Sequence, residues 1–154
     1  MNTFFEMACA EGERGMLAGD GGPFGAVVVK DGKVIGKGHN CVLCSHDSTA
    51  HAEITAMRQA EQALGTHDLT GCELYTTCYP CPMCLGAIMW ARISKVHYGC
   101  TADEAAAIGF DDRAFYDAFS TPDKNKFLTM HHHDNAKCRS LFQKWMALDN
   151  KVMY

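Results

Sequence analysis

The sequence predicts an α/β protein in which a central sheet carries helices on both of its faces. Short valine-rich runs indicate buried strands, longer segments with apolar residues at helical spacing lie between them, and turn signals separate the two kinds of segment. Helices and strands alternate after an initial hairpin. The first two strands should therefore pair antiparallel, and the later strands, which helices join, should be parallel.

The N-terminal part is expected to form a helix followed by a hairpin. Residues 2–17 place apolar side chains at loosely helical spacing, and a glycine-rich break follows them. Residues 24–29 form a short apolar run that is typical of a buried strand. The dipeptide Asp31-Gly32 strongly favours a two-residue hairpin turn, so residues 34–39 should return as the second strand.

A loop and a second helix are expected next. Residues 41–49 predict the loop. Ser48 or Thr49 can cap a helix that begins near Ala50, and Gly65 is a typical residue at its end.

The second half of the chain continues the alternation. Pro80 and Pro82 mark the start of a helix that ends near Arg92, because proline is tolerated in a first helical turn. The other predicted elements are strands at 74–77, 96–98 and 127–130 and helices at 102–108, 113–119 and 138–147.

The length and the net charge limit the classes of protein to which the chain can belong. A chain of 154 residues suits one domain, 1–154, and 47% apolar with 21% charged residues is ordinary globular composition. The net charge of −4 and the lack of a lysine or arginine run argue against a nucleic-acid partner, since phosphate binding depends on those residues. A small-molecule substrate is the better expectation.

Cysteine use and hydropathy indicate the compartment. Nine cysteines, an odd number, occur without a secretory signal, which favours a reducing cytoplasm with some thiols on a metal. The apolar runs are too short to cross a bilayer, so no membrane partner is expected.

Metal-ligating residues gather at two predicted helix starts. One start contains His51 and Glu53, and the other contains Cys81 and Cys84 after Pro80. A catalytic zinc ion needs three protein ligands and an open position for water, and cysteines three residues apart share one helix face. We expect His51, Cys81 and Cys84 to bind zinc, one ion per subunit. Glu53, which is not a ligand, should move the protons of an activated water.

Two other interpretations of these residues stay open. The residues could be ordinary core and surface positions whose spacing is coincidental. Alternatively, the cysteines of Cys41-x-x-Cys44 could join Cys78, Cys81 and Cys84 in a closed four-thiolate zinc site of a structural module. The second interpretation gives His51 and Glu53 no purpose.

These residues resemble the cytidine deaminase-like superfamily, and most closely bacterial guanine deaminases. The spacing His-x-Glu followed by Pro-Cys-x-x-Cys is the signature of zinc nucleobase deaminases. The resemblance covers nearly the whole chain. It is carried by residues 21–26, 39–40, 49–53, 81–88 with 90–92, 109–112 and the terminal Tyr154.

The resemblance implies a three-layer α/β/α sandwich with a mixed five-stranded sheet. It also implies a homodimer in which C-terminal segments, about residues 130–154, are exchanged. The implied reaction is hydrolysis of guanine to xanthine and ammonia. Alternative substrates are cytosine, cytidine or guanosine, and tRNA adenosine is a further one that the net charge disfavours.

The resemblance also assigns substrate-site residues. Asn40 should hydrogen-bond the purine, Phe24 and Trp90 should wall the ring, and Asp112 should assist proton transfer or bind the exocyclic amine. Tyr154 should close the partner's site. Without the resemblance the two aromatic residues would be core, Asp112 a solvated turn residue and Tyr154 a frayed terminus.

Two features depart from this pattern. Tyr79 stands before Pro80 where the guanine branch often has glutamate, so it bears on substrate preference. The run from His131 to His133 is internal, and we expect it to be a solvated loop without a functional role.

Overall fold

The computed structural model describes residues 3–121 and 127–154. The chain forms two compact units, Met1–Tyr116 and Asp117–Tyr154, which are described separately below. Among the described residues, the helices are too short or too polar to cross a membrane.

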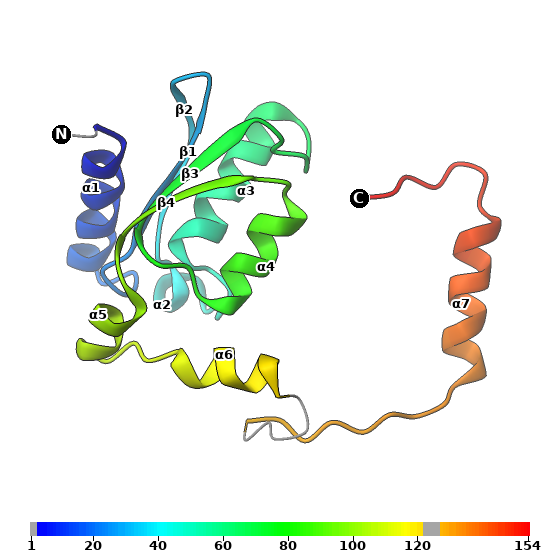
Figure 1. Ribbon diagram of the computed structural model, residues 1–154. Helices are drawn as coiled ribbons and strands as arrows, with labels where there is room; N and C mark the ends of the chain where they lie inside the picture. Colours follow the sequence, from blue (N-terminus) through cyan, green and yellow to red (C-terminus); the bar gives the residue numbers. More distant parts are fainter. Residues whose placement is uncertain (1–2, 122–126) are drawn as a thin grey trace. The chain divides into compact units, whose positions relative to one another are not determined.

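The first unit is built on a mixed four-stranded sheet (Figure 1). Its strands are β1 (Gly25–Lys30), β2 (Lys33–His39), β3 (Cys72–Cys78) and β4 (Lys95–Cys100), in the order β2-β1-β3-β4. Strand β1 pairs antiparallel with β2 and with β3, whereas β3 and β4 are parallel. The predicted hairpin and the predicted parallel pair are both confirmed.

Helices cover the two faces of this sheet. Helix α1 (Thr3–Ala18) lies on one face, and α3 (Ala52–Leu64) and α4 (Pro82–Trp90) lie on the other (Figure 1). The expected start of α1 at Asn2 lies outside the described residues. The three-layer α/β/α class is therefore confirmed for this unit.

Side-chain alternation in β1 explains how one short strand serves both layers. Val27 and Val29 pack with Ala8 of α1, while Ala26 and Val28 pack in the cluster that contains α3. Successive strand residues point to opposite faces, so an all-apolar strand is buried on both sides. The turn after β1 also matches expectation, because Asp31 and Gly32 both have positive φ, as a type I′ hairpin requires.

Helix α3 packs unusually close to β2. A side chain at Gly36 or Gly38 would meet the backbone of Ala56 at 2.3 or 2.6 Å. The helix ends as predicted, at Gly65 with φ of 66°. Its start differs from prediction.

The N-cap of α3 is His51, with extended backbone and no side-chain cap, so neither Ser48 nor Thr49 is the cap. Thr49 instead bonds to Asp47 through its backbone N–H and its hydroxyl. The prediction of a plain loop at 41–49 is also wrong, because residues Val42–Ser45 form the one-turn helix α2.

The remaining elements of this region agree closely with the sequence. Helix α4 starts at Pro82 and ends at Trp90, two residues before the expected end. Helices α5 (Ala102–Ala107) and α6 (Arg113–Ser120) match their predicted segments, and α5 begins with a Thr101/Glu104 capping box. The boundary between the two units falls within α6.

In the second unit, the described residues form one further helix, α7 (Ala136–Ala147), which is capped by Asn135. The predicted strand at 127–130 is wrong, and with it the predicted five-stranded sheet: the described residues form four strands. Phe127, Leu128 and Met130 are 54%, 63% and 81% exposed. An apolar run forms a strand only against a neighbouring strand edge, which the sequence pattern alone does not specify.

Candidate metal and catalytic site

Two helix starts on the same face of the sheet bring the predicted metal ligands together. His51 is the N-cap of α3 and Cys81 is the N-cap of α4, while Cys84 is the third residue of α4 and is fully buried. His51 Nδ1 lies 3.5 Å from Cys81 Sγ and 3.6 Å from Cys84 Sγ. The three donor atoms all lie within 4.8 Å of one another.

These distances fit a tetrahedral zinc ion. Bonds of about 2.05 Å to nitrogen and about 2.3 Å to sulfur at the tetrahedral angle place the two atoms roughly 3.6 Å apart. The observed nitrogen–sulfur distances of 3.5 and 3.6 Å already have this value. The donor set therefore accepts zinc with little rearrangement and leaves a fourth position.

Glu53 lies directly beside these donors. It is in the first turn of α3 and is 6% exposed. Its Oε2 is 3.5 Å from Cys84 Sγ, and its Oε1 accepts a hydrogen bond of 3.1 Å from the buried Thr76 hydroxyl. Burial raises the pKa of Glu53. The carboxyl group is thus held by Thr76 and by packing, which orients it toward the metal ligands.

The two thiols are not equivalent in this arrangement. The hydrogen bond from Cys84 and the contact with His51 together lower the pKa of Cys81 to about 4 against the effect of burial. The same sulfur–sulfur contact raises the pKa of Cys84, and the bond with Cys81 raises that of His51. Cys81 is therefore the more acidic of the two thiols, and the thiolate is the form that binds a metal.

Asn40 and Phe24 lie next to each other at the ends of the hairpin strands. The Asn40 N–H donates to the Phe24 carbonyl oxygen over 3.1 Å, and Asn40 is only 6% exposed. Its Oδ1 accepts a 3.1 Å bond from the Val42 N–H, so the amide is held in one orientation. The Phe24 ring is half-buried and meets Phe110 edge to face, with ring centroids 4.9 Å apart.

Phe110 is a residue that the sequence analysis did not assign. Residues 109–112, which include Phe110, belong to the segments that carry the family resemblance, but their sequence does not indicate a contact between Phe110 and another ring. The same stretch brings Asp112 into electrostatic reach of the metal ligands. Burial raises the pKa of Asp112, and the neighbouring charge of Cys81 raises it further, while His51 lowers it.

Tyr79, the departure from the family pattern, belongs to an aromatic cluster. Its ring centroid lies 5.1 Å from that of Tyr98 and 6.2 Å from that of Tyr116. The Tyr116 hydroxyl donates a 2.5 Å bond to the Pro80 carbonyl oxygen. Tyr116, which sequence reasoning missed, thus ties α6 to the segment that begins the Cys81 helix.

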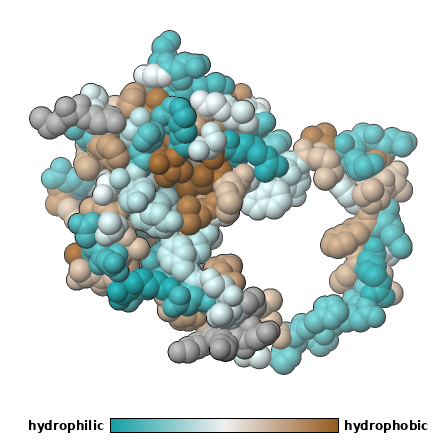
Figure 2. All heavy atoms as spheres, in the orientation of Figure 1, coloured by the Kyte–Doolittle hydropathy of each residue, from teal (hydrophilic) through white to brown (hydrophobic). Residues whose placement is uncertain are grey.

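Trp90 lies at the far end of α4 from the cysteines. Trp90 is the last residue of α4, about 9 Å along the helix axis from Cys84 at 1.5 Å per residue. It is 62% exposed, and the Arg92 guanidinium lies 5.9 Å from its ring centroid. Apolar atoms gather at the surface over α4 (Figure 2). Tyr154 is in the second unit and is 70% exposed.

The four-thiolate interpretation is disfavoured by the structure. Among the described residues, Cys41 and Cys44 group with Asp20, whereas Cys81 and Cys84 group with His51. Cys78 Sγ instead donates to the Thr101 carbonyl oxygen over 3.7 Å. The donors at the centre of the site are therefore one nitrogen and two sulfurs.

Comparisons with known proteins give a zinc-binding family and similar deaminases. The family model of the cytidine and deoxycytidylate deaminase zinc-binding region matches residues 1–100. A guanine deaminase of Bacillus subtilis is 45% identical over 152 residues, which cover 99% of this chain and 97% of that protein. A tRNA-specific adenosine deaminase of Agrobacterium fabrum is 42% identical over 116 residues, or 73% of each chain.

Solved structures give the same relationship. The crystal structure of the guanine deaminase from Bacillus subtilis matches with a TM-score of 0.95 and 46% identity, covering 100% of this chain and 99% of that one. A structure of guanine deaminase from Nitrosomonas europaea matches with a TM-score of 0.62 and 38% identity, over 71% of this chain and 62% of that one.

Proposed function

Because this chain belongs to the cytidine and deoxycytidylate deaminase family, we propose that it is a zinc-dependent enzyme that hydrolyses guanine to xanthine and ammonia. One observation carries the proposal: a nitrogen–sulfur–sulfur donor set spaced for zinc lies beside a buried glutamate. The choice of guanine is supported by the full-length similarity to a protein that is a guanine deaminase.

His51, Cys81 and Cys84 would hold the zinc ion, one per subunit. Zinc bound there supplies Lewis acidity that activates a water molecule near neutral pH. Glu53 takes a proton from the attacking water and passes it to the amine that leaves the ring carbon. Its raised pKa suits a group that must both accept and release a proton.

Asn40, Phe24 and Asp112 would bind the base. Since the Asn40 Oδ1 already accepts from the Val42 N–H, the Asn40 Nδ2 group is the donor to a ring acceptor, and Oδ1 keeps a second lone pair for a ring N–H. Phe24, braced by Phe110, offers a flat apolar wall. Asp112, close enough to influence His51, would receive the exocyclic amine or assist its proton transfer.

The second unit would complete the site of a partner subunit in a homodimer. Apolar residues of α7 are largely exposed: Leu141, Phe142 and Met146 are 65%, 74% and 67% exposed. A twelve-residue helix has little stability by itself and needs a surface for its apolar side chains. We therefore propose that residues from about 130 to 154 are exchanged between subunits, with Tyr154 closing the partner's site and Trp90 lining a pocket formed by both chains.

The chemistry of the site supports a proposal for the cellular setting. All nine cysteines are free, and the metal site needs reduced thiols. A reducing cytoplasm and a place in guanine catabolism are the setting we propose. The partner is a small nucleobase and not a nucleic acid or a membrane.

The test of the proposed reaction is ammonia release from a panel of substrates. Purified protein is incubated with guanine, guanosine, cytosine, cytidine, adenine, ammeline and a tRNA anticodon stem. Guanine should release the most ammonia, with xanthine as the second product. Release from cytidine or from the tRNA stem alone would overturn the guanine assignment and retain the deaminase chemistry. No release from any substrate would overturn both.

The proposed exchange has its own test. Deleting Tyr154 should raise KM for guanine and lower kcat while the mass in solution stays that of a dimer. The His131→Ala variant is the control, because we assign that residue no role. Kinetics of the deletion variant that equal the wild type would contradict the closing role, and a monomer for the intact chain would contradict the exchange.

A further inference from the structure

A second group of zinc-type donors lies outside the proposed catalytic set. Asp20, Cys41 and Cys44 each offer one donor atom, and these atoms all lie within 4.8 Å of one another. The Asp20 side chain is 26% exposed, Cys41 is half-buried and Cys44 is exposed, so a cation can reach them from solvent. Sequence reasoning considered these cysteines only as partners of Cys81 and Cys84.

The positions of the two cysteines match those of the catalytic pair, but the backbone of Cys41, with φ of −115° and ψ of 21°, differs from the extended backbone of Cys81. Cys41 is the N-cap of α2 and Cys44 its third residue, as Cys81 and Cys84 are in α4. This spacing turns both sulfurs toward one side of the turn. A tetrahedral zinc ion separates two sulfurs by about 3.8 Å and a sulfur and an oxygen by about 3.6 Å. Side-chain shifts of roughly 1 Å would therefore bring the three donors to bonding geometry.

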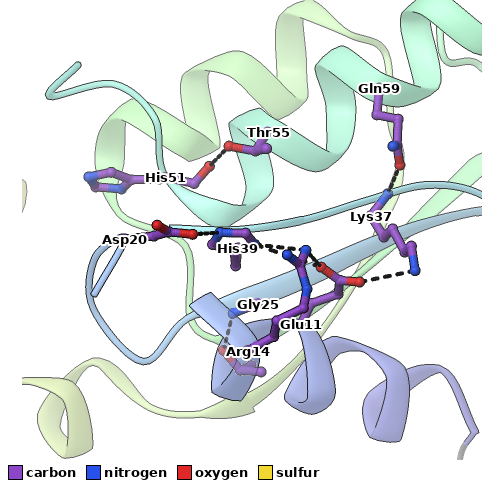
Figure 3. A network of polar contacts seen from close by, with 10 residues as sticks. Glu11, Arg14, Asp20, Gly25, Lys37, His39, His51, Thr55 and Gln59 are labelled. Carbon is purple, nitrogen blue, oxygen red and sulfur yellow. Dashed lines mark hydrogen bonds and ion pairs between the residues drawn. The ribbon is translucent and has the colours of Figure 1, made fainter. Parts of the chain in front are cut away.

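Asp20 is held in place by a partly buried polar network (Figure 3). His39 Nε2 is 2.7 Å from Asp20 Oδ2, and Arg14 lies 3.1 Å from His39 Nδ1. Since arginine only donates, Nδ1 accepts and Nε2 carries the proton that His39 donates to Asp20. Metal-ligating carboxylates are commonly oriented by such a hydrogen bond from behind.

The same aspartate also organises the cysteine turn. Its backbone carbonyl oxygen accepts from the N–H groups of Leu43 and Cys44, over 3.0 and 3.2 Å. The main chain of Asp20 thus holds the backbone of the turn, while its carboxylate lies near the two sulfurs. One carboxylate and two thiolates would carry three negative charges, which a divalent cation and the nearby Arg14 guanidinium together offset. Arg14 acts electrostatically on both Asp20 and Cys41.

We propose that Asp20, Cys41 and Cys44 form a second metal site, for a thiophilic divalent cation of the zinc type. The donor set favours zinc or cadmium over magnesium or calcium, which prefer oxygen ligands. Three protein donors leave a fourth position for water.

The second site would bear on substrate binding through one residue. Val42, between the two cysteines, donates its N–H to the Asn40 side chain, and the Cys41 N–H donates to the Ala50 carbonyl oxygen over 2.8 Å. Metal at Cys41 and Cys44 would therefore stiffen the turn that holds the Asn40 amide. Cation occupancy should lower KM for the base more than it changes kcat.

Zinc binding by the intact protein tests the proposal. The protein is equilibrated by dialysis against a series of buffered free Zn²⁺ concentrations, and zinc per chain is measured by elemental analysis. Wild type should reach two zinc ions per chain, and the double variant C41S/C44S should reach one. The control C9S/C138S, which changes exposed cysteines elsewhere, should keep two. His39→Gln should weaken the second equivalent by about 10- to 100-fold.

The outcomes separate this site from the catalytic one. Cys81→Ala should also lose one zinc ion, but a different one, so Cys81→Ala combined with C41S/C44S should bind none. One zinc ion in wild type, or two in folded C41S/C44S, would overturn the second site. A Cys41–Cys44 disulfide in protein purified under reducing conditions would overturn it as well. Asp20→Asn provides a second variant, and unchanged zinc affinity there would contradict the role of the carboxylate.

Discussion

Replacing Glu53 with glutamine removes one function of this residue and keeps its shape. Glutamine has the same length, and its carbonyl oxygen can still accept the hydrogen bond from the Thr76 hydroxyl, which is 3.1 Å in the wild type. Its amide cannot accept and release a proton near neutral pH. Glu53→Gln should therefore fold normally, bind zinc at His51, Cys81 and Cys84, and lose turnover.

The size of the loss follows from the role. A positioned proton-transfer group contributes about 10²- to 10⁴-fold to a rate, which corresponds to roughly 3–5 kcal/mol of barrier. Glu53 is 6% exposed and lies 3.5 Å from a metal-ligand sulfur, so bulk water cannot easily replace it. The upper part of that range is expected, with a much smaller change in KM.

The assay is steady-state release of ammonia from guanine, with zinc content measured on the same samples. Glu61→Gln, a change on the same helix but outside the site, is the matched control and should keep wild-type kinetics. Glu53→Gln with zinc bound and turnover within about threefold of wild type would refute the proton-transfer role. Loss of zinc would instead mean that Glu53 holds the metal site together.

Two further predictions concern stability. Burial raises the pKa of Glu11, but hydrogen bonds from Arg14 and Lys37 outweigh burial, so the net pKa is lowered. The ionised Glu11 therefore stabilises the folded state at neutral pH. This contribution is lost as the pH falls below about 4.3, the pKa of an unperturbed glutamate. Thermal melts of wild type and Glu11→Gln should converge with acidification; a constant difference would contradict this. Gly25→Ala would place its Cβ 1.9 Å from a backbone carbonyl oxygen of α1 and should lower the free energy of unfolding by about 1–3 kcal/mol or more. Gly86→Ala meets open space among the described residues, so the free energy of unfolding should stay unchanged or rise by up to about 1 kcal/mol. Equal melting temperatures for the two glycine variants would count against the close packing of α1 on β1.

Much of the first unit could be predicted from sequence because its local signals agree with its packing. The stretch 25–29 of β1 is buried on both faces and lies between two helical layers, and Asp31 and Gly32 adopt the turn that their residue types favour. The proximity of the three proposed metal ligands could be predicted from spacing, since Cys81 and Cys84 lie three residues apart at the start of α4 and His51 precedes α3. Short-range rules were sufficient for these elements.

Other features depend on long-range contacts. The edge-to-face pair of Phe24 and Phe110 and the bond from Tyr116 to Pro80 join segments far apart in sequence, and periodicity does not report such contacts. The one-turn helix α2 is stabilised by two hydrogen bonds to the backbone carbonyl oxygen of Asp20, a contact that the sequence of α2 does not reveal. The prediction of a strand at 127–130 was wrong because strand formation depends on pairing with a neighbouring strand edge, which is also a long-range contact.

Zinc removal and restoration test the central claim most directly. The purified enzyme is treated with a chelator, its zinc content is measured, and conversion of guanine to xanthine is followed before and after zinc is returned. We predict that xanthine production falls in proportion to the zinc lost and returns with zinc but not with magnesium, and that Cys81→Ala shows no recovery. Full conversion of guanine by the zinc-free protein, or none by the zinc-restored wild type, would contradict the account.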